Sequence, residues 1–185
     1  MINETIKQAI EFAHKAHNGQ KRKYTNTPYI DHPIRVATRL QERSDATIPM
    51  IAAAYLHDVV EDCGVTLEQI EQQFGKEIRD TVDWLTNKSK GSTLPRADRK
   101  KMDRERLSKA PKEIKIIKLI DRIDNLNEMQ EAPSKFKEKY IQESLLLAGV
   151  IGDADELLKQ ELIAATNKIK NESPQQTTQE ETSSQ

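Results

Sequence analysis

The sequence is poor in cysteine, in aromatic residues and in net charge. Its 185 residues include one cysteine, Cys63, which excludes an internal disulfide. The formal net charge of −1 does not suggest a binding surface for DNA or RNA. No apolar run approaches the length of a membrane span, and Met1 precedes polar residues rather than a signal peptide. These absences predict a cytoplasmic protein that binds neither nucleic acid nor membranes.

Glycine is also scarce and alternating strand patterns are rare, so the pattern that remains is helical. Apolar residues recur at helical spacing over most of the chain, and the six glycines fall mostly where turns are expected. We therefore predict an all-α fold in one domain, residues 1–170, with about eight helices. The expected helices span residues 2–17, 32–42, 47–60, 66–73, 76–86, 96–108, 111–130 and 135–168, the last broken near Gly149 or Gly152.

Two polar segments depart from this helical pattern. Residues 87–101 are basic and contain Gly and Pro, which predicts a mobile loop leading into a helix. Residues 171–185 are rich in Ser, Thr, Gln and Glu and lack aromatic side chains. Because such a composition buries too little apolar surface to fold, we expect a disordered C-terminal tail.

Two histidines and two aspartates stand out as candidate metal ligands. His57 and Asp58 are adjacent in AAAYLHDVVED, His32 lies in PYIDHP, and Asp121 lies in IKLIDRIDN. Their order is the spaced H...HD...D pattern of a metal-dependent phosphohydrolase. Two imidazoles and two carboxylates suit one divalent first-row ion that keeps positions open for water and an anionic substrate. Apolar runs lead directly into His57 and Asp121, and polar groups buried in this way need partners, which favours a metal site over a solvated face.

Two further carboxylates follow the His-Asp pair at helical spacing. Glu61 and Asp62 return to the same side of a helix one turn later. Carboxylates beside a metal can orient a water, take its proton or pass it to a leaving oxygen, so they are the candidate catalytic residues. The alternative is that they belong to a solvated acidic face. Asn125 follows Asp121 at i, i+4 and is expected on the same helix face.

Basic residues form a candidate site for a nucleotide. Lys21, Arg22 and Lys23 lie shortly before His32, in a segment too short to reach far from the metal. Arg can stack its planar guanidinium on a base and Lys can bind phosphate; a solvated basic turn is the alternative. Cations of the polar loop could bind further phosphates, although exposed charge explains them better. These are Lys88, Lys90, Arg96, Arg99, Lys100 and Lys101.

Three other reactive residues are assigned no functional role. His14 and His17 lie at i, i+3 on the first expected helix, but two ligands without a third make a weak metal site. Cys63 directly follows the acidic pair, and the sequence pairs no histidine with it. We therefore expect a structural thiol rather than a nucleophile.

Four segments, in this order, resemble the hydrolase domain of the RelA/SpoT homologue family. They are AHNGQKRK, TPYIDHPIRVA, AAYLHDVVEDCGVTLEQIEQQFG and IKIIKLIDRIDNL, and the resemblance covers about residues 5–130. The chain looks like a small stand-alone hydrolase of the metazoan MESH type, which implies a single HD-domain helical bundle. The implied reaction is hydrolysis of the 3′-pyrophosphate of guanosine tetra- or pentaphosphate, giving pyrophosphate and GDP or GTP, usually with manganese. Because no synthetase segment follows, we expect degradation of this alarmone and not its synthesis.

The resemblance also implies roles for individual residues. It implies metal ligation by His32, His57, Asp58 and Asp121, catalysis by Glu61 and Asp62, contact with the base by Arg22 and Lys23, and a place near the ribose for Asn125. The sequence departs from the family at Cys63, where Thr is common, and at Asp124, where His or Tyr is common.

Two alternative functions remain open beside alarmone hydrolysis. The same pocket could accept another nucleotide, namely an adenine alarmone, NADPH or a deoxynucleotide, and another first-row metal could replace manganese. The domain could also be a binding module that senses a nucleotide. The intact pair of Glu61 and Asp62 favours turnover, because a sensor needs no proton-transfer groups beside a bound water.

Overall fold

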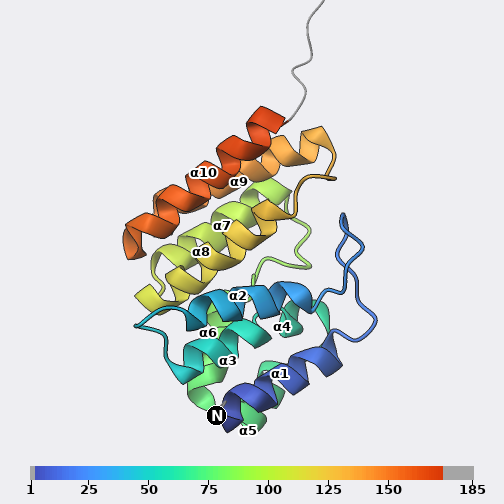
Figure 1. Cartoon of the computed structure of the whole chain (residues 1–185), viewed down its shortest axis with the longest axis vertical. Coiled ribbons are helices and arrows are strands. Elements are labelled where there is room, and N and C mark those ends of the chain that lie inside the picture. Colours follow the sequence, from blue (N-terminus) through green and yellow to red (C-terminus); the bar gives the residue numbers. More distant parts are fainter. Residues whose placement is uncertain (1–2, 173–185) are drawn as a thin grey trace, which may run out of the picture.

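The computed structural model describes residues 3–172, which form α-helices, one short 3-10 helix and no β-strand within this range (Figure 1). The predicted all-α class is therefore confirmed. The tail predicted to be disordered lies, from residue 173 on, outside the described residues. The elements are α1 Glu4–Ala16, α2 Asp31–Gln41, α3 Ile48–Leu56, α4 Val59–Asp62, α5 Leu67–Phe74, α6 Lys76–Leu85, α7 Arg96–Ser108, α8 Lys112–Asn127, α9 Ser134–Ile151, η1 Gly152–Ala154 and α10 Glu156–Glu172.

Several helices begin at side chains that cap the free backbone N–H groups of the first turn. Asn3 accepts from the backbone N–H of Thr5 at 2.9 Å at the start of α1. Thr66 and Gln69 form the full capping box at the start of α5, each side chain bonding to the backbone of the other. These local signals explain why the observed helix starts lie within about two residues of the predicted ones.

Two of the expected helices are each divided in two. The segment predicted as one helix over 47–60 breaks at His57 and Asp58, which separate α3 from α4. His57 Nδ1 donates to the carbonyl of Ala54 at 2.7 Å and so satisfies one of the free carbonyls at the end of α3. The last expected helix breaks at η1, which begins at Gly152 as predicted.

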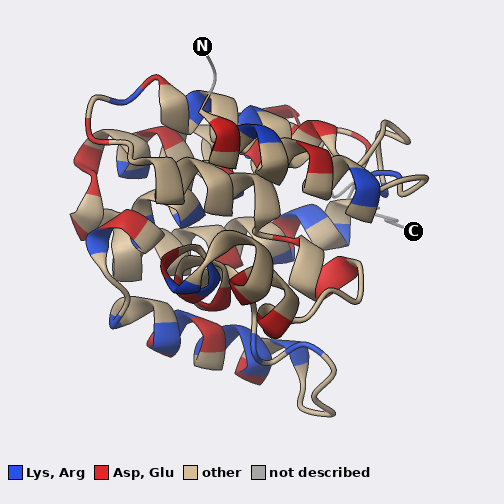
Figure 2. Ribbon diagram, turned by 90° about the horizontal axis from the view of Figure 1, so that it is seen from below, with Lys and Arg blue, Asp and Glu red and all other residues tan. Residues whose placement is uncertain are grey.

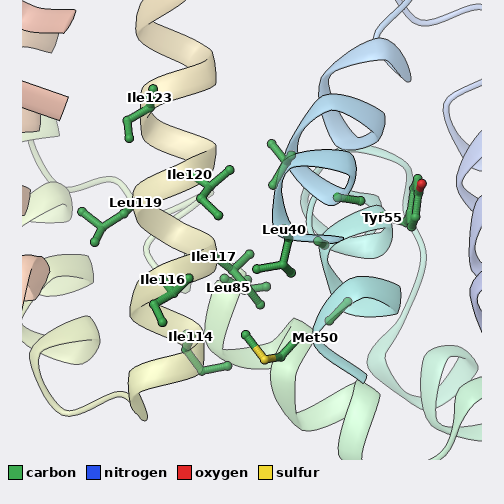
Figure 3. Close-up of a cluster of buried hydrophobic side chains, with 14 of the residues drawn as sticks. Leu40, Met50, Tyr55, Leu85, Ile114, Ile116, Ile117, Leu119, Ile120 and Ile123 are labelled. Atoms are coloured by element: carbon green, nitrogen blue, oxygen red, sulfur yellow. The ribbon is translucent and has the colours of Figure 1, made fainter. Parts of the chain in front are cut away.

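Helix α8 lies at the centre of the molecule, between α2 on one side and α10 on the other (Figure 1). Every residue from Ile116 to Ile123 is buried, so this stretch of the helix is enclosed on all sides and lies in the core. Figure 3 shows Ile117 and Ile120 directed toward Leu40 of α2, whereas Leu119 and Ile123 point to the opposite side. The polar residues of this stretch, Lys118, Asp121 and Arg122, are therefore buried and need partners.

The surface carries charges of both signs. Lys and Arg alternate with Asp and Glu along the outer helices (Figure 2). Among the helices of residues 3–172, none is both long and apolar enough to cross a membrane.

Candidate functional site

The four predicted metal ligands come together from three parts of the fold. His32 lies in the first turn of α2, His57 and Asp58 at the break between α3 and α4, and Asp121 within α8. His32 Nε2 is 3.2 Å from both His57 Nε2 and Asp121 Oδ1. His57 Nε2 is 3.2 Å from Asp58 Oδ2 and 3.8 Å from Asp121 Oδ1, and His32 Nε2 is 3.7 Å from Asp58 Oδ2. Ligands about 2.0–2.2 Å from a shared ion lie at most roughly 4.4 Å apart, so these separations suit one ion.

The hydrogen bonds of the two histidines orient both rings toward the same point. His57 Nδ1 donates to the Ala54 carbonyl at 2.7 Å, and His32 Nδ1 donates to the Asp124 carboxylate at 2.6 Å, because these oxygens act only as acceptors. In neutral rings the two Nε2 atoms then carry lone pairs that face each other across 3.2 Å. Such lone pairs repel unless a cation or a proton lies between them. The donor set therefore fits a divalent ion.

The charges of this cluster shift the pKa values of its members. Burial disfavours a charged imidazole, but the carboxylates, Asp58 foremost and then Asp121, outweigh it and raise the pKa of His57 to about 9. Burial likewise opposes the charge of Asp58, yet His57 and His32 hold the pKa of this carboxyl below its ordinary value. The carboxylates thus attract positive charge to the cluster.

Lys118 belongs to this site, although it was not among the predicted site residues. Its Nζ lies 2.8 Å from Asp121 Oδ2, and the side chain is buried. Burial disfavours the ammonium, but Asp121 and Glu61 more than compensate and raise the pKa of Lys118. The contact fixes one oxygen of Asp121 and leaves the other facing the histidines. A lysine inside the apolar run IIKLI was the available signal, because a buried ammonium needs a carboxylate.

Tyr29 is a second part of the site that the sequence analysis missed. Its hydroxyl donates to Asp58 Oδ2 at 2.8 Å, and its ring packs edge-on against His32. Burial, followed by the charge of Asp58, raises the pKa of Tyr29, so the phenol stays protonated. Its place three residues before His32, in PYIDHP, was the only signal in the sequence.

The two candidate acids lie next to the cluster in α4. Glu61 accepts from both the backbone N–H and the side-chain amide of Asn87, and Lys90 donates to Asp62. Burial raises the pKa of Glu61, and the charge of Lys118 opposes this effect. A carboxyl with a raised pKa exchanges a proton more readily near neutral pH than an exposed one. The loop that follows α6 therefore covers the acid pair.

A cavity of about 470 Å³ adjoins the cluster and is within the usual size range for small-molecule sites. Tyr29 and Asn125 connect the two, because each lines the cavity and also bonds to a candidate ligand. Aromatic side chains of α9, Phe136 and Tyr140, form part of the wall. The residues lining the cavity are Gln20, Lys21, Arg22, Lys23, Tyr24, Thr25, Tyr29, Arg96, Asn125, Glu128, Met129, Phe136 and Tyr140.

The predicted substrate-binding residues all line this cavity. Arg22 donates to Glu128 at 2.6 Å and to Asn125 Oδ1 at 2.7 Å, and its guanidinium lies over the Tyr29 ring at 5.1 Å. Lys23 is exposed and lies near the Tyr24 ring. Asn125 Nδ2 donates to Asp121, so this amide links a candidate metal ligand to Arg22.

The surroundings of Cys63, His17 and His14 give these residues no catalytic role. Cys63 Sγ lies 3.2 Å from His17 Nδ1, a contact that the sequence did not indicate. Burial, followed by the charges of Asp62 and Asp58, raises the pKa of the Cys63 thiol to about 11, which disfavours a nucleophile. His17 is buried and stacked on Tyr29, whereas His14 is exposed.

Six basic residues lie in the polar loop and in the helix that follows it, and most of them form ion pairs with acidic side chains. Lys88 pairs with Asp83, and Arg96 pairs with Glu143 at 2.7 Å. Arg96 also lines the cavity and is therefore the best placed of the six to contact a ligand there.

Known proteins share this fold and these segments. The HD domain family matches residues 9–147. MESH1 of Xenopus tropicalis, a guanosine-3′,5′-bis(diphosphate) 3′-pyrophosphohydrolase, is 36% identical over 141 residues, which are 75% of this chain and 77% of the frog protein. A guanosine-3′,5′-bis(diphosphate) 3′-pyrophosphohydrolase of Vibrio cholerae is 40% identical over 107 residues, which are 57% of this chain and 14% of the bacterial protein.

A solved structure has the same architecture. It is described as a metazoan ortholog of SpoT that hydrolyzes ppGpp, and it matches with a TM-score of 0.73 and 28% identity over 92% of this chain and 96% of that chain. These matches confirm the resemblance to the RelA/SpoT homologue hydrolases. The chain belongs to the HD domain family and, within it, to the relatives of MESH1.

Proposed function

We propose that this protein hydrolyses the 3′-pyrophosphate of guanosine tetra- and pentaphosphate. The observation that carries the proposal is the convergence of two imidazoles and two carboxylates beside a cavity large enough for a nucleotide. The relatives named as enzymes of this activity support the choice of substrate. In the reaction a water oxygen bonds to the phosphorus on the ribose 3′ oxygen and the bond to that oxygen breaks. GDP or GTP and pyrophosphate are released, and the 3′ oxygen gains a proton.

His32, His57, Asp58 and Asp121 are the proposed ligands of one divalent ion. The mixed nitrogen and oxygen set suits manganese, and other first-row ions are chemically acceptable. Such an ion supplies Lewis-acid chemistry, lowering the pKa of water and polarising phosphate oxygens. Lys118 holds the outer oxygen of Asp121, and Tyr29 holds Asp58, so both carboxylates are fixed before substrate arrives.

Glu61 and Asp62 are the proposed proton-transfer residues. Glu61 lies in a buried environment that raises its pKa, and this allows it to accept a proton from water and return it to the 3′ oxygen. Asp62 is exposed and paired with Lys90, so we assign it the supporting role of exchanging that proton with solvent.

Arg22, Lys23 and Asn125 are the proposed substrate-binding residues. Glu128 and Asn125 hold the guanidinium plane of Arg22 over Tyr29, which prepares a flat surface for a purine. Lys23 contributes positive charge at the mouth of the cavity, and Asn125 lies between the base side and the metal ligands.

A panel of nucleotides tests this function. The purified protein with Mn²⁺ is incubated with guanosine tetraphosphate, an adenine alarmone, NADPH and a deoxynucleotide, and the products are separated and identified. We expect GDP and pyrophosphate from guanosine tetraphosphate at the highest kcat/KM, and no product from an Asp58→Asn variant. Preferential turnover of another nucleotide would refute the substrate assignment, and tight binding without any product would favour a sensor. The cytoplasmic location and the lack of a nucleic-acid partner stay predictions from the sequence.

A further inference from the structure

The proposed metal ligand His32 is hydrogen-bonded to a carboxylate of α8 through the ring nitrogen that faces away from the cluster. Its Nδ1 donates to Asp124 Oδ2 at 2.6 Å, and the imidazole is completely buried. A carboxylate at this position fixes both the tautomer and the rotation of the ring, so that Nε2 faces the cluster. Asp124 therefore acts on the metal centre without reaching it.

Asp124 is in turn held by Arg35, which lies one turn after His32 on α2. Arg35 donates twice to Asp124, at 2.7 and 2.8 Å, and once more to Glu128 at 2.5 Å. The side chain of Arg35 is 41% exposed, but the side chains of Asp124 and Glu128 are only 14% and 16% exposed. A surface cation that bridges two largely buried carboxylates differs from an ordinary surface ion pair, because its removal leaves Asp124 with the His32 N–H alone and Glu128 with Arg22 alone.

Glu128 connects this arrangement to the substrate cavity. It accepts from Arg35 with one oxygen and from Arg22 Nε with the other, the latter at 2.6 Å. Arg22 lines the cavity, and Asn125 holds its other side. A continuous series of charge-assisted bonds therefore runs from His32 through Asp124, Arg35 and Glu128 to Arg22.

We propose that Arg35 is a positioning residue for both halves of the site, orienting the metal ligand His32 through Asp124 and the base-contacting Arg22 through Glu128. This inference rests on the proposed function, because it takes the cluster to bind a metal and the cavity to bind a nucleotide. The proposed arrangement has two arms: a metal arm, in which Asp124 contacts His32, and a cavity arm, in which Glu128 contacts Arg22. The two arms can be tested separately, because they use different carboxylates.

Four variants test the proposal, each with three measurements. Asp124→Asn leaves one acceptor oxygen for the three donors that now share Asp124, Glu128→Gln removes the charge from the cavity arm, and Arg35→Met removes the bridge. Arg39→Met is the matched control, because Arg39 lies one turn further along α2 and makes a similar forked pair with Glu161. The measurements are Mn²⁺ affinity of the metal-free protein by calorimetry, KM and kcat at saturating Mn²⁺, and the thermal midpoint.

We expect Asp124→Asn to weaken Mn²⁺ binding by about 10- to 100-fold, as loss of a ligand-orienting carboxylate usually does, with a smaller change in KM. Glu128→Gln should raise KM and leave Mn²⁺ affinity unchanged. Arg35→Met should both weaken Mn²⁺ binding and raise KM. Arg39→Met should change neither, although each arginine variant removes one cation from the surface of α2. A merely structural role would lower the thermal midpoint without this division between metal affinity and KM.

Unchanged Mn²⁺ affinity and KM in folded Arg35→Met would overturn the proposal. If Arg35→Met did not fold, Asp124→Asn and Glu128→Gln would test the proposal instead. The proposal would be refuted if Asp124→Asn did not act mainly on Mn²⁺ affinity and Glu128→Gln mainly on KM. A wild-type protein that bound no Mn²⁺ would instead refute the metal centre itself, and this inference with it.

Discussion

Glu61 and Asp62 are neighbours in the sequence but lie in different environments. Glu61 is partly buried and bonded to Asn87, whereas Asp62 is exposed and paired with Lys90. Burial raises the pKa of Glu61, and a group with a raised pKa is better suited to move a proton near neutral pH. We therefore expect Glu61 to carry more of the proton transfer than Asp62.

Glu61→Gln should keep metal and substrate binding but slow turnover by about 10²- to 10⁴-fold, the usual contribution of a positioned acid or base. The amide matches the carboxyl in size, so Asn87 retains an acceptor. Steady-state kinetics together with a Mn²⁺ binding assay measure the effect, with Glu68→Gln on the exposed face of α5 as the control. Lost binding at unchanged kcat would make Glu61 a substrate-holding group instead.

Arg22→Ala should raise KM more than it lowers kcat, because stacking on the base is made equally in the ground state and the transition state. The expected cost is on the order of 1 to 2 kcal/mol, or about tenfold in KM. Arg22→Lys should restore little, since an ammonium lacks the planar surface that lies over Tyr29.

Arg79→Ala is the control for the Arg22 variants, because it removes another Arg–Glu pair on α6, away from the cavity. An unchanged KM for guanosine tetraphosphate in Arg22→Ala would place the base elsewhere.

At the level of single residues, the sequence indicated the groups that the proposed chemistry requires, but it did not indicate the residues that hold these groups in place. His57 and Asp121 were predictable because apolar runs lead directly into them. Arg35 and Asn87 were not, because their partners Asp124 and Glu61 are distant in sequence and helical periodicity carries no information about such contacts.

At the level of helices, Asp155 joins two parts of the fold at the start of α10. Its Oδ1 accepts from the backbone N–H of Leu158 at 3.0 Å, and its Oδ2 accepts from Arg43 at 2.8 Å. Burial opposes the charge, but the N–H of Leu158 and the guanidinium of Arg43 hold the pKa of Asp155 below its ordinary value. The stabilisation is thus present above the ordinary carboxyl pKa and is lost as pH falls through the lower, folded value.

Asp155→Ala should lower the free energy of unfolding by about 1 to 2 kcal/mol at neutral pH, the usual cost of removing a helix cap. The difference from wild type should shrink in acid, where Asp155 becomes protonated. Urea denaturation of the variant and of the wild type, at neutral pH and at acidic pH, measures this difference in the free energy of unfolding.

Asp45→Ala is the matched control for Asp155→Ala. Asp45 pairs with the same Arg43 but is more exposed, so its removal should cost less. An equal cost for the two variants would show that α10 does not depend on the cap.

Helix positions were largely predictable because caps and apolar spacing are local signals. The break at His57 and Asp58 was not, since the apolar pattern of AAAYLHDVV continues through it. The bond from His57 to the Ala54 carbonyl ends α3 there, and it depends on a side chain whose other nitrogen lies 3.2 Å from His32 Nε2 of α2. Tertiary contacts therefore override the helical pattern at this point.

At the level of the whole molecule, the proposed metal joins segments that are far apart in the sequence. Its ligands come from α2, from the junction of α3 and α4, and from α8. An ion that binds only the folded state adds its binding free energy to the stability, about 2.7 kcal/mol at 100 times its dissociation constant. For a chain of this size that corresponds to a rise in the thermal midpoint of roughly 5–10 °C.

We therefore expect Mn²⁺ to raise the thermal midpoint of the metal-free protein and a chelator to reverse the rise. His57→Ala should abolish the response, whereas His14→Ala, on the exposed face of α1, should retain it. Scanning calorimetry with and without Mn²⁺ tests both. An undiminished response in His57→Ala would contradict the assignment of the ligands.

The complete burial of residues 116–123 in α8 has a consequence for how this protein can change in length during evolution. Removing one residue near the start of α8 would turn the rest of the helix by about 100°. Arg122 would then take the place of Asp121, so that a guanidinium replaced the carboxylate of a proposed metal ligand. Insertions and deletions are therefore expected in exposed stretches such as residues 91–95, where added length disturbs no helix, and not within residues 112–125.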